Sequence, residues 1–354
     1  MLNYMETPDK GKMRINVVQR GSRIPVENAK VSISYSGDPT QVIEEIQTDA
    51  NGQSEDLSLA APPLEYSMEP GQNQPYSEYN LKITADGFEP VTVSGSEELP
   101  DVTAYQRVEM DSIINLNQNL DTVVIGPHTL YGDYPPKIAE AEIKPITGTG
   151  EIVLSRVVVP EYIIIHDGPV TDNSAADYYE RYRDYIKNVA ACEIYATWPR
   201  EALEANILAI MSFTMNRVYT EWYRNKGYDF TITSSTAFDH KWIRGKNTYD
   251  TIDTIVDEIF TNYLSRPNVN QPILTQYCDG KRVSCPEWMT QLQVRINMVG
   301  RHCSEVEICC KRQPPQAANP AKQDSFLWDS AMFMNNSSIL QSFLQLFDIQ
   351  SFQQ

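Results

Sequence analysis

One carboxylate in this chain has the surroundings of an acid catalyst. Glu193 stands in the segment NVAACEIYATWPRE, between an apolar run and the aromatic residue Trp198. Apolar and aromatic surroundings disfavour the charged form of a carboxyl group and raise its pKa, so such a group can donate a proton near neutral pH. The same local pattern also fits a helix-terminal Glu that simply faces water. Burial of Glu193 therefore decides between an acid catalyst and a surface residue.

A second polar segment, TITSSTAFDHKWIRG, follows later in the chain. Small hydroxylic side chains of this kind hydrogen-bond the hydroxyl or N-acetyl groups of a ligand, and here they are Ser234, Ser235 and Thr236. Asp239 and His240 come next, so a Ser-His-Asp hydrolase is an alternative. We disfavour it because sequence neighbours rarely form a triad and the chain has no G-x-S-x-G elbow in this segment.

The cysteines are concentrated in the second half of the chain, at positions 192, 278, 285, 303, 309 and 310. Cys278 and Cys285 flank a short Asp-Gly-Lys-Arg turn, where they either form a disulfide or remain two reduced thiols. A zinc site is disfavoured because the spacing of these cysteines is longer than usual and His302 is the only nearby histidine. We expect no metal and no cofactor.

The elements that must position Glu193 are expected to be helices. The first spans 177–189 and carries four tyrosines, which pack a helix against its domain more often than they bind sugar. The second begins near Pro199, a residue suited to a first helical position. A third spans 247–264. His166 and Asp167 end an apolar run before Gly168, which favours a strand-end turn over a ligand pair.

The first third of the chain is strand-like. Six segments alternate apolar and polar residues, separated by Gly, Asp, Asn and Pro turns: MRINVV, AKVSISY, QVIEEIQT, SEYNLKITA, EPVTVS and AYQRVEM. Short strands at this spacing predict a β-sandwich. The phrases IPVENAKVSI, TDANGQ and ITADGFEP resemble the carboxypeptidase regulatory-like fold, a small immunoglobulin-like sandwich. The resemblance implies a spacer or targeting module without chemistry of its own.

The Glu193 region resembles the catalytic domain of the stage II sporulation protein D (SpoIID) family, which contains peptidoglycan lytic transglycosylases. The resemblance rests on four segments in order: NVAACEIYATWPREALEANILAIMSF, YDFTITSSTAFDHKWIRG, TIDTIVDEIF and QPILTQYCDGKRVSCPEWMTQ. The phrases EIYATWP and YCDG…CPEW are similar to clostridial spore cortex-lytic enzymes. The resemblance implies that Glu193 is catalytic. It also implies that Ser234, Ser235, Thr236, Asp239, His240, Tyr277 and Trp288 line the substrate cleft.

These patterns together predict a multidomain chain, an all-β immunoglobulin-like sandwich followed by a mixed α+β catalytic domain. The expected divisions are a flexible tail over 1–12, the sandwich over 13–110, a connector over 111–155, the catalytic domain over 156–291 and an atypical tail over 292–354. Thr290 and Gln291 begin a family motif that then stops. The following stretch is rich in Cys and basic residues, as a reading-frame change would produce.

The 354 residues carry a formal net charge of −18. An acidic surface argues against nucleic acid and gives no attraction to anionic membranes. No run approaches the ~20 apolar residues of a membrane helix, so we expect no membrane insertion. The N-terminus lacks the apolar region of a secretory signal. We expect an extracellular or spore-associated protein that is cytoplasmic before release.

Two classes of function follow. The first is a lytic transglycosylase that acts on peptidoglycan glycan strands, with an activating protease as a further partner. The second is an inactive wall-binding or spore-coat protein, in which the sandwich attaches to a partner and the second domain is a scaffold. A phage or injection-system wall hydrolase would share the chemistry of the first class at another location.

Overall fold

The computed structural model describes residues 8–68, 73–113, 121–127, 152–265, 270–278 and 289–290, and the described part is a mixed α and β protein with several sheets. The chain divides into two compact units. Unit 1 is Met1–Thr129 with two later segments, Tyr195–Trp198 and Ile243–Thr254, and unit 2 is the remainder. Both later segments come from the part of the sequence in which the catalytic domain was expected.

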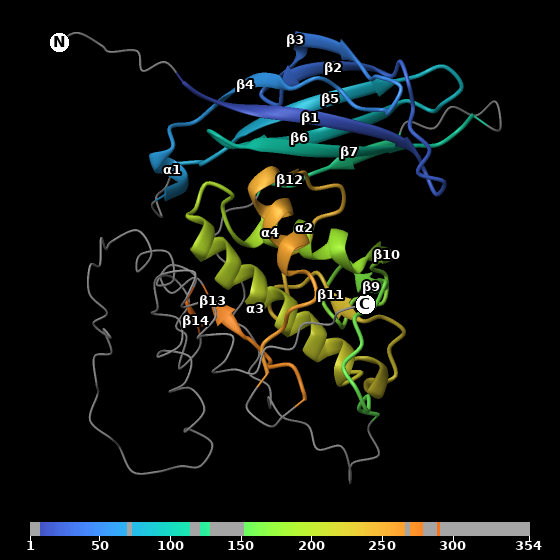
Figure 1. Ribbon diagram of the computed structural model, residues 1–354. Coiled ribbons are helices and arrows are strands. Elements are labelled where there is room, and N and C mark those ends of the chain that lie inside the picture. Colours follow the sequence, from blue (N-terminus) through green and yellow to red (C-terminus); the bar gives the residue numbers. More distant parts are fainter. Residues whose placement is uncertain are drawn as a thin grey trace. The chain divides into compact units, whose positions relative to one another are not determined.

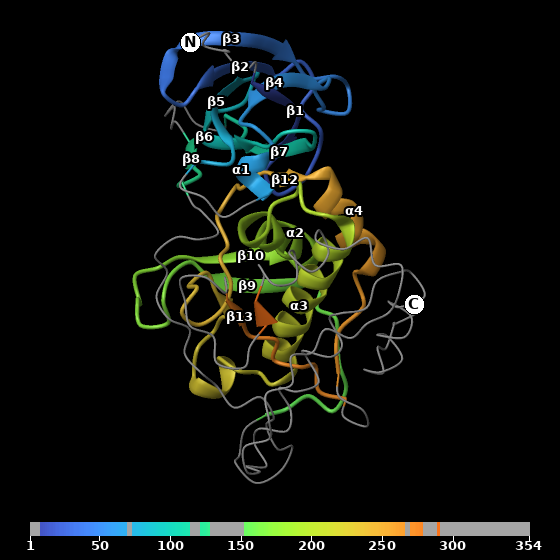
Figure 2. The ribbon, with the colours of Figure 1, turned by 90° about the vertical axis from the view of Figure 1, so that its left-hand side faces the viewer.

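Unit 1 is built from two sheets, which Figures 1 and 2 show as two layers. The first has the order β12-β7-β1-β4, with bounds Thr248–Tyr249, Thr103–Met110, Asp9–Gln19 and Leu57–Ala61. The second has the order β3-β2-β5-β6-β8, with bounds Asp38–Gln47, Lys30–Tyr35, Ser77–Thr84, Val91–Glu98 and Asp121–Val124. A short helix, α1, spans Glu65–Met68.

All six strand-like segments of the sequence lie in strands of unit 1, and alternate residues are buried along much of β1, β5 and β7, whereas β3 is exposed over most of its length. The largest contributions come from Met13, Ile15, Ile33, Tyr79 and Leu81. Strands β4, β8 and β12 were not anticipated, because β4 and β8 are only five and four residues long and β12 is a two-residue strand. Two layered sheets are what the predicted sandwich requires, and the immunoglobulin-like assignment stays a prediction.

The segment Ile243–Thr254 is fixed into unit 1 by polar contacts. β12 pairs antiparallel with β7. The Asn247 side chain accepts from the Glu97 N–H at 3.0 Å and donates to the Glu97 carbonyl at 2.9 Å, as a neighbouring strand would. Lys246 Nζ forms a buried ion pair with Glu97 Oε2 at 2.6 Å. An ion pair removed from water needs such additional hydrogen bonds to be favourable.

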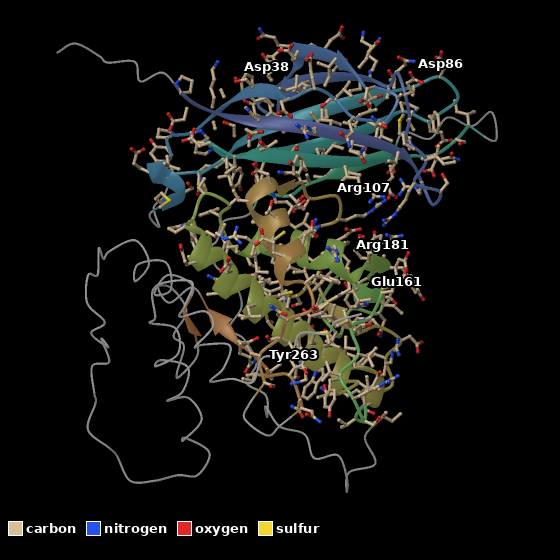
Figure 3. All side chains as sticks on the ribbon, viewed as in Figure 1. Asp38, Asp86, Arg107, Glu161, Arg181 and Tyr263 are labelled. Carbon is tan, nitrogen blue, oxygen red and sulfur yellow. The ribbon has the colours of Figure 1, made fainter. Side chains whose placement is uncertain are left out.

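Unit 2 contains a three-stranded sheet of order β10-β9-β11, with bounds Asp177–Arg181, Tyr162–His166 and Ile232–Thr233. Figure 3 labels Arg181 at the end of β10 and Glu161 just before β9. The helical elements are α2 (Tyr182–Glu193), α3 (Arg200–Tyr219) and η1 (Arg224–Lys226). Helix α4 (Asp250–Ile259) begins in unit 1 and ends in unit 2, and β13 (Tyr277–Cys278) pairs parallel with β14 (Met289–Thr290). None of the described helices could cross a lipid bilayer.

The helices differ from their expected bounds in three places. The helix expected over 177–189 begins only at Tyr182, because residues 177–181 pair with β9 as a strand. Pro199 caps α3 from one position before its first residue. The helix expected over 247–264 is shorter at both ends and spans Asp250–Ile259. Asn247 lies before its start, where its side chain hydrogen-bonds to the backbone of Glu97. His166 ends β9 at a turn, as predicted.

Glu98 is an isolated buried carboxyl group of unit 1. Its side chain is 0% exposed, and neither carboxylate oxygen has a hydrogen-bond partner among the described residues. Oε1 lies so close to the backbone that a Cβ at Gly11 would be 2.0 Å from it. Burial, reinforced by the nearby negative charge of Asp250 and opposed by Lys246, raises the pKa of Glu98 to about 10. Glu98 is therefore protonated in the folded protein at neutral pH.

This raised pKa predicts a pH-dependent stability. In the unfolded chain Glu98 loses its proton near pH 4.5, so above that pH the folded state binds one proton more and stability falls as pH rises towards 10. Glu98→Gln removes this proton uptake. We expect the variant to gain thermal stability relative to wild type at pH 8 and little at pH 4.5, as measured by calorimetry at both values. An equal shift at both pH values would contradict a buried proton on Glu98.

Candidate functional site

Glu193 occupies the inward-facing stripe of α2 at the last residue of the helix. Tyr182, Ile186 and Val189 precede it on this stripe and are buried. Spacings of four and seven residues return to the same helix face, so Glu193 continues this stripe and is half-buried. The helix ends because Ile194 adopts an extended conformation, with φ −143° and ψ 153°. Glu193 is therefore neither fully buried nor fully exposed to water.

The carboxylate of Glu193 is held by a backbone amide. The N–H of Lys241 donates to Oε1 at 2.6 Å, a short contact typical of a hydrogen bond to a charged acceptor. Because Oε1 is an acceptor here, the proton of the acid form belongs on Oε2.

His240, the residue before Lys241, is fully buried between two helices. Its Nδ1 lies 3.2 Å from the hydroxyl of Tyr185 on α2, and its ring contacts Phe213 on α3 at 4.5 Å between centroids. Burial raises the pKa of Tyr185 well above its usual value, and the nearby carboxylates of Asp239 and Glu193 add to the shift. The tyrosine therefore keeps its proton beside His240.

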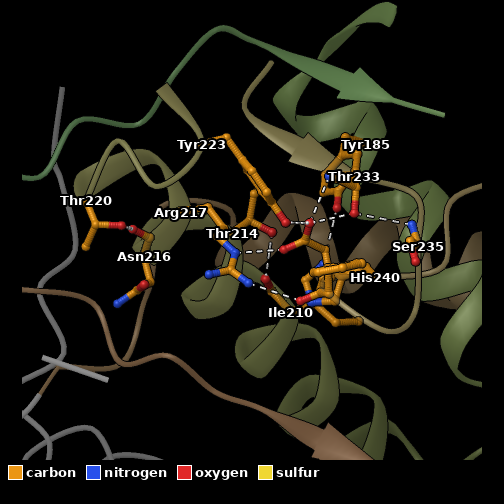
Figure 4. A network of polar contacts seen from close by, with 12 residues as sticks. Tyr185, Ile210, Thr214, Asn216, Arg217, Thr220, Tyr223, Thr233, Ser235 and His240 are labelled. Atoms are coloured by element: carbon orange, nitrogen blue, oxygen red, sulfur yellow. Dashed lines mark hydrogen bonds and ion pairs between the residues drawn. The ribbon is translucent and has the colours of Figure 1, made fainter. Parts of the chain in front are cut away.

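Asp239 belongs to a buried polar network, and Figure 4 labels its partners Arg217, Tyr223 and Thr233. Its Oδ1 accepts from Arg217 Nε at 2.7 Å. Its Oδ2 accepts from the hydroxyl of Tyr223 at 2.6 Å, and from the N–H and hydroxyl of Thr233 at 2.9 and 2.7 Å. Both charged side chains of the pair are 0% exposed. Asp239 is therefore bound to Arg217, while His240 Nδ1 lies against the Tyr185 hydroxyl, and these contacts give no support to the triad considered from sequence.

The predicted substrate-binding residues separate into two groups. Asp239 and His240 are fully buried, so their side chains cannot contact a glycan strand as predicted. They instead directly precede Lys241, whose N–H contacts Glu193. Ser234, Ser235 and Thr236 are partly exposed at the other end of the same loop. The Ser234 hydroxyl donates to Asp167 Oδ1 at 2.8 Å. A ligand would compete with that carboxylate for the hydroxyl.

Several predicted residues lie beyond what the structure describes. Trp288 and Cys285 fall outside the described residues, and only the backbone of Tyr277 and Cys278, in β13, is described. Their substrate-binding and disulfide assignments stay predictions. Among the described residues, no group of three or more His, Cys, Asp or Glu side chains could hold a metal ion.

Sequence reasoning missed two residues of the site. Lys241 acts through its backbone N–H, which every residue except proline carries, so its side-chain type gave no signal. Arg217 gave a signal that could have been used. It lies in α3 within the largely apolar stretch ILAIMSFTMNRVY, where a fully buried arginine requires an anion.

The Arg217–Asp239 pair generates a stability prediction. Arg217→Met leaves the Asp239 carboxylate buried without its counter-charge, and breaking one partner of a buried pair costs about 3–5 kcal/mol. Arg183→Met is the matched control, because Arg183 pairs with Asp257 at side-chain exposures of 44% and 46%, where a pair contributes about 0–1 kcal/mol. Urea unfolding should show the large loss for Arg217→Met alone. Equal losses in the free energy of unfolding would show that the buried pair contributes no more to stability than the exposed pair.

Comparison with known proteins adds an independent observation. The SpoIID family model, described as stage II sporulation protein, matches residues 179–262. This range contains Glu193, Arg217, Asp239 and Lys241. The comparison with curated proteins found no match.

Solved structures show only distant similarity. The TIE protein of Bacillus anthracis is 16% identical, covering 29% of this chain and 17% of its own, with a TM-score of 0.21. The wild-type catechol 1,2-dioxygenase of Acinetobacter radioresistens is 14% identical, covering 33% and 58%, with a TM-score of 0.21. The 5-hydroxyisourate hydrolase of Klebsiella pneumoniae is 12% identical, covering 28% and 89%, with a TM-score of 0.18. The chain spans less than two thirds of the length of the first two. What the comparisons show is that residues 179–262, with Glu193 among them, are similar to the SpoIID family model.

Proposed function

We propose that the protein is a peptidoglycan lytic transglycosylase that cleaves the β-1,4 bond from N-acetylmuramic acid to N-acetylglucosamine and forms a 1,6-anhydro end. One observation carries the proposal. Within the segment that matches the SpoIID model, Glu193 ends α2 half-buried, with Oε1 held at 2.6 Å by the Lys241 N–H. A carboxyl group fixed in this way can give up and take back a proton at a constant position.

The proposed reaction uses Glu193 twice. In its acid form the carboxyl donates its proton to the glycosidic oxygen as the bond to the muramyl C1 breaks, which leaves an oxocarbenium-like sugar. The resulting carboxylate then accepts the proton of the C6 hydroxyl of the same sugar, and O6 bonds to C1. No water is consumed and Glu193 ends protonated, as it began. Proton transfer by a positioned group contributes about 10²–10⁴-fold in rate.

The muramyl N-acetyl group is proposed to stabilise the positive charge that develops at C1, in place of the second carboxylate of ordinary glycosidases. Ser234, Ser235 and Thr236, which are partly exposed, are proposed to bind the substrate's hydroxyl and N-acetyl groups. Tyr277 and Trp288 are proposed as stacking partners for sugar rings. Glycan binding of this type needs no basic surface, which agrees with the acidic composition.

The biological setting is part of the proposal. Spore cortex is the proposed substrate, which places the protein outside the cell or in the spore, with a protease as its activator. The competing function is an inactive wall-binding or spore-coat protein. It is favoured by the interruption of the family motif after Thr290 and Gln291 in the sequence.

Glu193→Gln tests the reaction. The amide keeps the shape of the carboxyl group but has no acidic proton to transfer, so release of anhydromuropeptides from purified sacculi should fall at least about 10²-fold. Mass spectrometry of the soluble products measures the loss. Glu201→Gln is the matched control, because Glu201 is an exposed glutamate in the first turn of α3, and it should retain wild-type activity.

Each product pattern of the wild-type protein decides between functions. Anhydro ends support the transglycosylase, and reducing ends would indicate a hydrolase instead. Intact sacculi that still bind the protein in a pull-down would favour the inactive wall-binding function. Undiminished formation of anhydro ends by Glu193→Gln would remove Glu193 from the mechanism.

A further inference from the structure

We propose that Asp239 and Arg217 are positioning residues for Glu193: their buried network fixes the loop that presents the Lys241 N–H to the Glu193 carboxylate. The kinetic part of this inference rests on the proposed function. The structural part, that the network holds the Lys241 amide in place, stands without it.

The environment of Asp239 requires an ionised carboxylate. Its carboxylate oxygens accept from four donors: Arg217 Nε, the Tyr223 hydroxyl, and the N–H and hydroxyl of Thr233. An ionised carboxylate is an acceptor at both oxygens and satisfies all of them. An asparagine at this position would turn its NH₂ group towards donors on one side. The site is therefore specific for a negative charge.

Arg217 is itself held in one place. Its guanidinium lies 4.7 Å from the ring centre of Phe213 and 4.9 Å from that of Trp222, and cation–π attraction is favourable at such distances. It also donates from Nη2 to the carbonyl of Phe238 at 3.0 Å. The same guanidinium thus contacts both the side chain of Asp239 and the backbone just before it.

Three consecutive residues are then anchored to different elements. Asp239 is tied to α3 through Arg217 and to β11 through Thr233. His240 is enclosed by the rings of α2 and α3. Lys241 donates its N–H to Glu193. Two buried anchors directly before Lys241 leave its amide little freedom, so the amide is directed at Glu193 by the residues that precede it.

The network acts on Glu193 through Lys241 and not on the substrate. Asp239 and Arg217 are both 0% exposed, so neither can touch a glycan. Misplacement of a catalytic group by about 1 Å can cost about 10²-fold in rate. Loss of the network should therefore lower kcat and leave KM nearly unchanged.

The test uses isosteric pairs of variants in the full chain. Thr233→Val removes one donor to Asp239, whereas Thr233→Ser keeps the hydroxyl and should behave as wild type. Asp239→Asn removes the charge. Asn216→Ala is the control, because Asn216 lies next to Arg217 on α3 and its buried Nδ2 donates elsewhere, to the Pro272 carbonyl at 2.7 Å.

The structural readout is hydrogen exchange of the Lys241 amide, followed by NMR on protein labelled with ¹⁵N-lysine, with the resonance assigned by Lys241→Arg. We expect exchange to be at least about 10-fold faster in Thr233→Val and faster still in Asp239→Asn. Thr233→Ser and Asn216→Ala should remain protected even if Asn216→Ala is less stable. The kinetic readout is kcat and KM for anhydromuropeptide release, with kcat about 10²-fold lower in Asp239→Asn.

The two readouts separate failure of this inference from failure of the proposed function. Wild-type protein without lytic activity would refute the function and leave the exchange measurement to decide the inference. Unchanged Lys241 protection in both Thr233→Val and Asp239→Asn would overturn the inference. It would also be overturned if Asn216→Ala lowered kcat as much as Asp239→Asn, because the effect would then be one of general stability.

Discussion

The hydrogen bond from the Lys241 N–H to Glu193 Oε1 is the contact on which the site depends. It joins two parts of the chain 48 residues apart, the end of α2 and the end of the loop after β11. A glutamate side chain has three rotatable bonds, and its immobilisation costs entropy that must be offset by contacts. The backbone amide supplies a contact whose direction is set by the fold. Glu193 is therefore a candidate catalyst because the loop after β11 places a backbone amide next to its carboxylate and holds the carboxylate in position.

The described part of the chain places buried carboxylates in contrasting environments. Asp239 is surrounded by donors and faces Arg217. Glu98 has no donor to its carboxylate among the described residues and keeps its proton, with a pKa of about 10. Burial favours the protonated form of a carboxyl group, and hydrogen-bond donors favour its charged form. Glu193 is half-buried and accepts the Lys241 N–H at Oε1.

The sequence was informative where periodicity and side-chain type carry the signal. The alternating segments located six strands of unit 1, and Pro199 located the start of α3. The sequence failed where pairing overrides propensity. Residues 177–181 carry tyrosines that suggest an amphipathic helix, but they form a strand because their backbone pairs antiparallel with the apolar strand β9. The return of Ile243–Thr254 to unit 1 depends on Asn247 replacing a strand neighbour for Glu97, a contact 150 residues away in sequence.

For the candidate site too, the sequence identified residues by their type but not by their contacts in the fold. Glu193 could be chosen from sequence because an acid among apolar residues is unusual. Asp239 and His240 could be noticed, but their type suggested contact with substrate, and only burial shows that they face inward. Their positions explain why a loop can carry both kinds of residue. Its first residues, Ser234 to Thr236, remain partly exposed, whereas its last ones are anchored in the core. The partly exposed start of the loop is accessible to solvent, whereas the buried residues Asp239 and His240 directly precede the Lys241 amide that contacts Glu193.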